Sequence, residues 1–196
     1  HKWIKLNRFR ACVETYHHRD YDHSMQKLDE WAVRFGGLKE EVTFVVQDEI
    51  DCDVEIGYDG WSVDGQYPSR SFQGYELKNE LYLGSLLAYE DLPDEVRTVN
   101  EAMSPMLEGA GYRNFLATEI RVKDKVPYFI DPTMRMPGQT GEQLLETMEN
   151  IAEVIWHGAH GELIQPKWNA KFAASATLNY KGDCEDWKVI RVPEES

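Results

Sequence analysis

The chain has 196 residues, a net charge of -14, 42% hydrophobic residues and three cysteines. This apolar content suffices for a packed core in one ordinary domain or two small ones. The acidic balance argues against a sequence-independent nucleic-acid binder and against an anionic membrane surface, because both need clustered Lys and Arg. No apolar run approaches the roughly 20 residues of a membrane-spanning helix. The widely spaced cysteines favour a reducing cytoplasm over a zinc site or a disulfide framework.

The first half of the chain predicts strands around one helix. Residues 2–6 form a short strand, and the chain enters it at once, so we expect an N-terminal portion of the protein to precede it. Residues 24–35 form a helix, which starts at a capping serine and ends at two glycines. A buried strand follows over 42–50. Residues 53–68 predict two strands joined by a hairpin turn at 59–60, an Asp-Gly pair.

The second half continues with helices and strands. A helix is predicted over 92–111, with an internal proline expected to kink or split it. Two strands, 112–122 and 126–131, form a hairpin. Residues 141–160 have the spacing of one amphipathic helix, and the tail returns to strand over 171–192. Strands and hairpins with interspersed helices indicate the α+β class, with largely antiparallel sheets.

Two acidic residues lie on the second hairpin: Glu119 in its first strand and Asp131 at the end of its second. Side chains alternate between the two faces of a strand, so their separation depends on the register. A three-residue turn over 123–125 would make Asp131 the diagonal neighbour of Glu119 on the same face, about 7–8 Å away. A two-residue turn would put the carboxylates on opposite faces.

Paired carboxylates on one face repel each other unless a cation, a partner or a proton relieves them. Mg²⁺ is a natural partner, because it takes one or two carboxylates and completes its shell with water and phosphate oxygens. Arg121 would share this face and Arg135 follows closely, so a plain salt-bridge network is the alternative.

A histidine-rich stretch at 14–23, ETYHHRDYDH, carries His17, His18 and His23 among acidic residues. A metal site is conceivable there, although no spacing within it matches a zinc motif. A solvated loop is the alternative that its polarity favours.

The order of these features resembles an ATP-grasp domain. One strand carries an acid, the next strand ends in a second acid, and Asp131-Pro132-Thr133-Met134-Arg135 leads into a glycine-containing loop. Upstream, a strand lysine, a hinge strand over 44–50 and a hairpin after the hinge follow the family's order. Within the superfamily the order is most similar to the phosphoribosylamine–glycine ligases, and the similarity runs from about Lys5 to Gly182.

The resemblance implies that ATP lies between two α+β lobes and that a phosphoryl group passes to a carboxylate, whose acylphosphate an amine then attacks. It implies Mg²⁺ on Glu119, Asp131 and Thr133, and catalytic roles for Arg135 and Arg121. The implied ATP-binding residues are Lys5, Arg10, Gln47, Ile50, Glu55 and Lys78. The implied partners are a small-molecule carboxylate and an amine. We expect the ATP-binding and catalytic region over 1–165 and the start of a small β-rich subdomain over 166–196.

Three features depart from the family's pattern. Thr133 replaces the usual metal-binding Asn, the loop after Lys5 has no glycine, and Gln47 stands where an acid is common. These departures leave a second hypothesis open: a nucleotide-binding or interaction module that keeps the fold without catalysis. A purely structural domain, held by a cluster of Arg135, Asp131 and Glu119, is a third.

Overall fold

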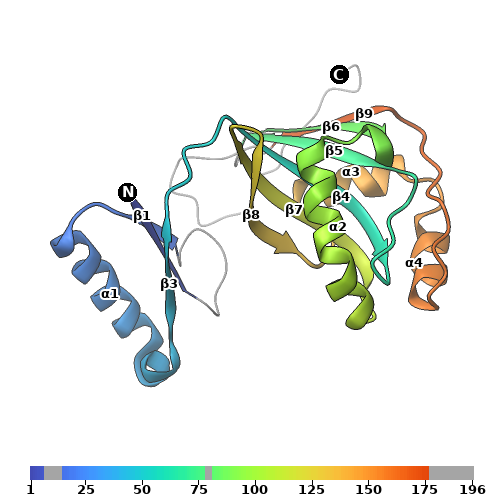
Figure 1. Ribbon diagram of the computed structural model, residues 1–196. Helices are drawn as coiled ribbons and strands as arrows, with labels where there is room; N and C mark the ends of the chain where they lie inside the picture. Colours follow the sequence, from blue (N-terminus) through green and yellow to red (C-terminus); the bar gives the residue numbers. More distant parts are fainter. Residues whose placement is uncertain (7–14, 78–80, 177–196) are drawn as a thin grey trace, which may run out of the picture. The chain divides into compact units, whose positions relative to one another are not determined.

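The computed structural model describes residues 1–6, 15–77 and 81–176. The chain divides into two compact units, His1–Asp53 and Val54–Ser196 (Figure 1). The expected boundary near residue 165 is a different kind of division, between a catalytic region and a C-terminal subdomain, and it stays a prediction. Among the described residues, no helix is long and apolar enough to cross a membrane.

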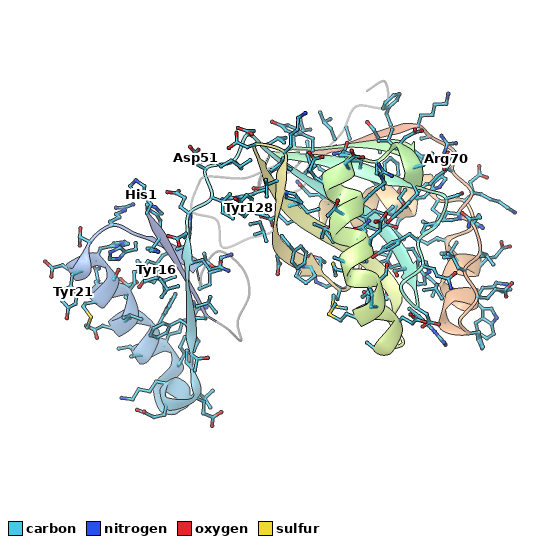
Figure 2. All side chains as sticks on the ribbon, viewed as in Figure 1. His1, Tyr16, Tyr21, Asp51, Arg70 and Tyr128 are labelled. Carbon is cyan, nitrogen blue, oxygen red and sulfur yellow. The ribbon has the colours of Figure 1, made fainter. Side chains whose placement is uncertain are left out.

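The first unit is a three-stranded antiparallel sheet with a helix on one face. The strand order is β2-β1-β3. Its elements are β1 (Lys2–Leu6), β2 (Thr15–His18), α1 (Tyr21–Phe35), the 3-10 helix η2 (Gly36–Glu41) and β3 (Phe44–Asp48). Leu6 and Tyr16 pack with Trp31 of α1 in a small core, and Figure 2 shows Tyr16 between strand and helix.

Helix α1 starts earlier than the sequence predicts. Asp20 caps it by accepting a hydrogen bond from the His23 backbone N–H at 2.8 Å. Ser24, the predicted cap, lies inside the helix, and its hydroxyl oxygen is 2.6 Å from His18 Nδ1. Aspartate and serine are comparable capping residues, so Asp20 can start the helix one turn before Ser24.

The second unit is built on a six-stranded antiparallel sheet in the order β8-β7-β4-β5-β6-β9. Its strands are β4 (Val54–Val63), β5 (Arg70–Leu77), β6 (Leu81–Ala88), β7 (Arg113–Lys123), β8 (Val126–Thr133) and β9 (Phe172–Ala176). Its helices are η3 (Tyr89–Asp91), α2 (Asp94–Gly109), α3 (Gln139–Thr147) and α4 (Ile151–Ala159).

Both faces of this sheet are covered. Helix α2 packs with Tyr58, Leu116 and Ile120 on one face, whereas α3 and α4 pack with Trp61 and Phe72 on the other (Figure 1). The seven residues from Gly57 to Val63 are therefore all buried. The two antiparallel sheets with their flanking helices confirm the predicted α+β class.

Three predicted features are wrong. The strand predicted over 42–50 is not buried, because all five residues of β3 are exposed. Asp59 and Gly60 lie in the middle of β4, and the chain turns later, where Asp64 and Gly65 have φ angles of 49° and 78°. Burial of β4 on both faces explains the error, because an Asp-Gly pair indicates a turn only where the chain is free to leave the sheet.

The helix predicted over 141–160 is two helices separated at 148–150, where Met148 pairs with Trp168. Helix α2 runs through Pro105 as one helix.

Candidate functional site

Glu119 and Asp131 face each other directly across β7 and β8. The turn between these strands has two residues, Asp124 and Lys125, both with positive φ, so the predicted three-residue turn is wrong. Such a turn alone would put the carboxylates on opposite faces. The register shifts between Glu119 and Ile120, where Ile130 is the extra residue of a bulge in β8. This bulge reverses the alternation of β8 and returns Asp131 to the face of Glu119.

The two carboxylates line a pocket of about 340 Å³ on the sheet face that carries α3. Its walls come from β4, β5, β6, β7 and β8 and from residues 137–140 at the start of α3, all within the second unit. Thr133, directly opposite Ala117, also lines it. The structure thus brings together all three predicted magnesium ligands. Their role as metal ligands stays a prediction.

Asp59 is a pocket residue that sequence reasoning missed. It shares the pocket face of β4 with Glu55 and Gly57, and its side chain is buried. The Tyr82 hydroxyl donates a hydrogen bond to Asp59 Oδ2. That hydroxyl occupies the space above Gly74, where an added Cβ would lie 1.6 Å from the oxygen. The available signal was the spacing of Glu55 and Asp59, which puts both acids on one strand face.

The pocket lining combines acidic side chains with a helix N-terminus. No lysine or arginine is among the described residues that line it, whereas Asp59, Glu119 and Asp131 are. Residues 138–140 at the N-terminus of α3 also line it, and the N-cap Gly138 gives no side-chain hydrogen bond. The first N–H groups of a helix lack partners within it and favour negative charge. A metal-bound phosphate presents both charges that this lining suits.

The two predicted catalytic arginines are not among the pocket-lining residues. Arg121 Nε lies 3.0 Å from Glu55 Oε2, so Glu55, an implied ATP-binding residue that lines the pocket, is engaged in an ion pair. Arg135 is exposed, and its Nη1 donates to the Met136 carbonyl at 2.9 Å. Among the described residues, no ion pair joins Arg135 to Asp131. The described part of the chain therefore does not contain the salt-bridge cluster on which a purely structural role would depend.

The remaining predicted ATP-binding residues lie in the first unit or outside the described residues. Lys5 is on β1 opposite Val45 and Thr15, Gln47 is on β3, and Ile50 follows β3. Arg10 and Lys78 lie outside the part of the chain that the structure describes, as do residues 7–14 of the glycine-free segment after Lys5 and the end of the resemblance at Gly182. Their roles stay predictions.

No protein-family model matches the sequence, and no curated protein matches it. Solved structures do match. An N5-carboxyaminoimidazole ribonucleotide synthetase from Thermus thermophilus has a TM-score of 0.55 at 13% identity, over 84% of this chain and 44% of that one. An L-amino acid ligase from Bacillus licheniformis has a TM-score of 0.55 at 17% identity, over 92% and 45%. The chain has an ATP-grasp-like fold.

This fold confirms the ATP-grasp resemblance predicted from the sequence. A phosphoribosylglycinamide synthetase from Anaerococcus prevotii is similar at a TM-score of 0.42 and 15% identity, over 82% of this chain and 39% of that one. Likeness to this particular ligase stays a prediction. The ATP-grasp-like chain spans less than half the length of each of these structures.

Proposed function

We propose that the protein is an ATP- and Mg²⁺-dependent carboxylate–amine ligase that acts through an acylphosphate. The observation that carries the proposal is the pocket in which Glu119 and Asp131 meet across a bulge and which the N-terminus of α3 also lines. The ATP-grasp-like fold supports ligase chemistry and ATP use in general terms. The acid and the amine are small molecules of unassigned identity, and a cytoplasmic location is part of the proposal.

The donor set fits a hard cation. Glu119 and Asp131 offer carboxylate oxygens and Thr133 a hydroxyl oxygen, and such ligands hold Mg²⁺ together with water and phosphate. When bound, Mg²⁺ would neutralise the charge of the transferring phosphoryl group. Thr133 is a weaker ligand than the amide it replaces, so we assign it to a metal-bound water or to a supporting contact.

Other residues would position the reacting groups. The N-terminus of α3, which lines the pocket, would bind phosphate or acylphosphate oxygens. The exposed Arg135 follows the pocket strand by two residues, and its guanidinium would leave the Met136 carbonyl to bind the same oxygens. We assign Lys5 to the ATP phosphates on the basis of the resemblance alone.

The first test is nucleotide binding by the full-length protein. Calorimetry with ATP and Mg²⁺ should detect binding to the wild type. Asp131→Asn should weaken the ATP affinity measured with Mg²⁺ by at least about tenfold, because it removes one charged ligand of the ion. Asp124→Asn, the same substitution at the other end of the hairpin, is the matched control and should bind normally. No ATP binding to the full-length wild type would overturn the proposal.

A second candidate is a nucleotide-binding module without catalysis. It is favoured by Thr133 and by the absence of both arginines from the pocket lining. Hydroxylamine traps an acylphosphate as a hydroxamate, so a panel of carboxylates with ATP, Mg²⁺ and hydroxylamine separates the two candidates. Hydroxamate formation that is lost in Asp131→Asn supports the ligase. Tight ATP binding with no hydroxamate from any acid supports the module.

A further inference from the structure

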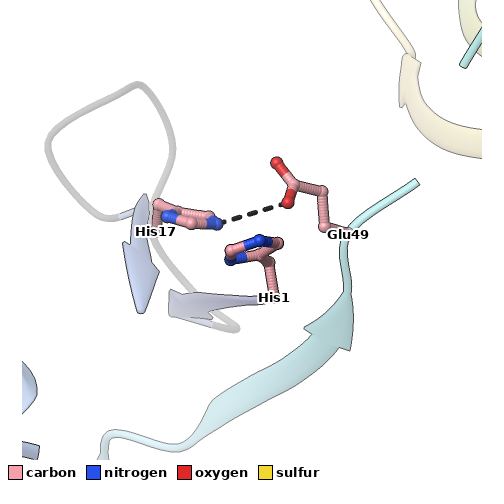
Figure 3. A group of neighbouring side chains, drawn as sticks. All are labelled: His1, His17 and Glu49. Carbon is pink, nitrogen blue, oxygen red and sulfur yellow. Dashed lines mark ion pairs between the residues drawn. The ribbon is translucent and has the colours of Figure 1, made fainter. Parts of the chain in front are cut away.

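The first unit carries a second group of potential metal ligands, unrelated to the pocket. His1, His17 and Glu49 meet at one end of the three-stranded sheet, and each comes from a different strand or its immediate extension (Figure 3). His17 is on β2 opposite Trp3, and the Glu49 backbone N–H donates to the His1 carbonyl at 3.2 Å. The alternation of β1 places His1 and Trp3 on the face away from the α1 core.

The donor atoms are close enough to share one ion. One nitrogen from each imidazole and one Glu49 oxygen all lie within 4.8 Å of one another. His17 Nε2 and Glu49 Oε2 are 3.4 Å apart. Two donors at about 2.0–2.1 Å from a tetrahedral zinc ion lie roughly 3.3 Å from each other. This pair is therefore already at the separation that zinc requires.

The His17 nitrogen lacks the contacts expected of an ordinary histidine. Nε2 is shielded from solvent, and the structure gives it no hydrogen-bond partner among the described residues. The His17 ring packs against the rings of His1 and Trp3, with centroids 5.3 and 5.2 Å away. These contacts fix the ring while its nitrogen points toward Glu49 (Figure 3). A solvent-shielded ring nitrogen that makes no hydrogen bond is costly, and a metal shared with the nearby carboxylate would satisfy it.

Lys2 of the neighbouring strand β1 does not pair with Glu49. Lys2 pairs with Asp48, and its hydrogen bond lowers the pKa of that carboxyl. Lys2 and Asp48 are register partners on the opposite face of the sheet, away from His1. Among the described residues, the ion-pair partner of Glu49 is His17.

We propose that His1, His17 and Glu49 form a binding site for a divalent transition metal, with zinc as the ion its geometry fits best. Two imidazoles and one carboxylate leave one tetrahedral position for water or another ligand. The site differs from the all-oxygen pocket, because imidazole suits zinc, copper or nickel rather than magnesium. A bound ion would tie the ends of β1, β2 and β3 together and stabilise this unit.

Zinc and cobalt titrations of the complete chain test the site. Calorimetry with Zn²⁺ should show one site, and Co²⁺ should give the visible absorption of a four-coordinate ion. His17→Gln and Glu49→Gln should each weaken zinc binding by about tenfold or more, as loss of a ligand does. Glu49 is exposed, so its variant keeps the test informative if His17→Gln fails to fold.

The matched control is a second histidine–glutamate pair in the other unit. His157 Nδ1 lies 2.6 Å from Glu162 Oε2, and this pair belongs to no three-ligand group among the described residues. His157→Gln should leave zinc and cobalt binding unchanged. Undetectable binding to the wild type, or binding that His17→Gln and Glu49→Gln leave intact, would overturn the proposal. The proposal would also be overturned if His157→Gln alone abolished the heat of zinc binding.

Discussion

The two units bury their sheets differently, and this difference separates the two proposed sites. In the first unit every residue of β3 is exposed and the core lies on one face only. In the second unit helices cover both faces, and β4 is buried along most of its length. On an open sheet face, polar side chains can bind a ligand at the surface. A doubly covered sheet admits a ligand only where the covering ends, at the start of α3.

The largest difference between the units should appear on truncating one phenylalanine in each. Phe72 of β5 is fully buried, so Phe72→Ala should lower the free energy of unfolding by about 3–5 kcal/mol. Phe44 of β3 is 48% exposed, so Phe44→Ala should cost about 0.5 kcal/mol or less. Urea unfolding measures both. Equal losses would show that β3 is covered in solution.

A smaller loss of stability is expected from filling the space above Gly74. An added Cβ would lie 1.6 Å from the Tyr82 hydroxyl, so Gly74→Ala should cost about 1–3 kcal/mol and push Tyr82 away from Asp59. Gly37→Ala in the first unit meets nothing within 4 Å and is the control. Thermal unfolding gives the stability, and ATP titration shows whether the pocket tolerates the displacement. An unchanged melting temperature for Gly74→Ala would contradict the packing described.

Alkaline pH should weaken the second unit through its buried tyrosines. Burial raises the pKa of Tyr58 and Tyr67 well above the usual value, and that of Tyr112 to about 12. Above about pH 10 these phenols ionise in the unfolded chain but not in the folded one, so stability falls as pH rises. The slope is at most about 1.4 kcal/mol per pH unit for fully buried Tyr58. Urea unfolding at several alkaline pH values measures it.

A tyrosine replacement isolates this effect. Tyr67→Phe removes one titrating phenol, so the decline with pH should become shallower even though loss of the hydrogen bond to the Asn100 carbonyl lowers stability at neutral pH. Ultraviolet absorbance of the phenolate follows the ionisation directly. A slope that Tyr67→Phe leaves unchanged would assign the alkaline loss to other groups.

The smallest expected effect is a gain in stability. Like charges directly opposite on a sheet repel, so Asp131→Asn should raise metal-free stability by about 0.2–1 kcal/mol. Saturating Mg²⁺ should erase this advantage, because the wild type alone would bind the ion at full strength. Thermal unfolding with and without Mg²⁺ makes the comparison. A variant less stable than the wild type in metal-free buffer would show that Asp131 has a structural partner.

The sequence predicted most of the fold because its signals were local. Periodicity located α1 and α2, and the strand pattern located the β7–β8 hairpin, to within a few residues. The errors came where tertiary burial overrode local chemistry. The Asp-Gly pair of β4 lies between two covered faces, and the helix beyond Gly138 breaks where Met148 pairs with Trp168.

The site was predicted in part, for a different reason. Residue type and order selected Glu119, Asp131 and Thr133, which do line one pocket. The turn geometry used to connect them was wrong, and the bulge that joins them has no sequence signature comparable to an Asp-Gly turn. Asp59 was missed because its neighbour Gly60 indicated a turn. The meeting of His1 with His17 and Glu49 depends on strand pairing over long sequence separations, which spacing alone cannot show.

The bulge at Ile130 fits the length of β8 to the register of the pocket. With the two-residue turn, a regular ladder would pair Ile130 with Glu119, and the bulge excludes this one residue so that Asp131 takes its place. Removing residue 130 would leave Phe129 paired with Ile120 and Asp131 paired with Glu119 in a regular ladder. We therefore expect deletion of Ile130 to keep the two carboxylates on one face, whereas one further residue inserted between Phe129 and Asp131 would need a larger bulge to do so.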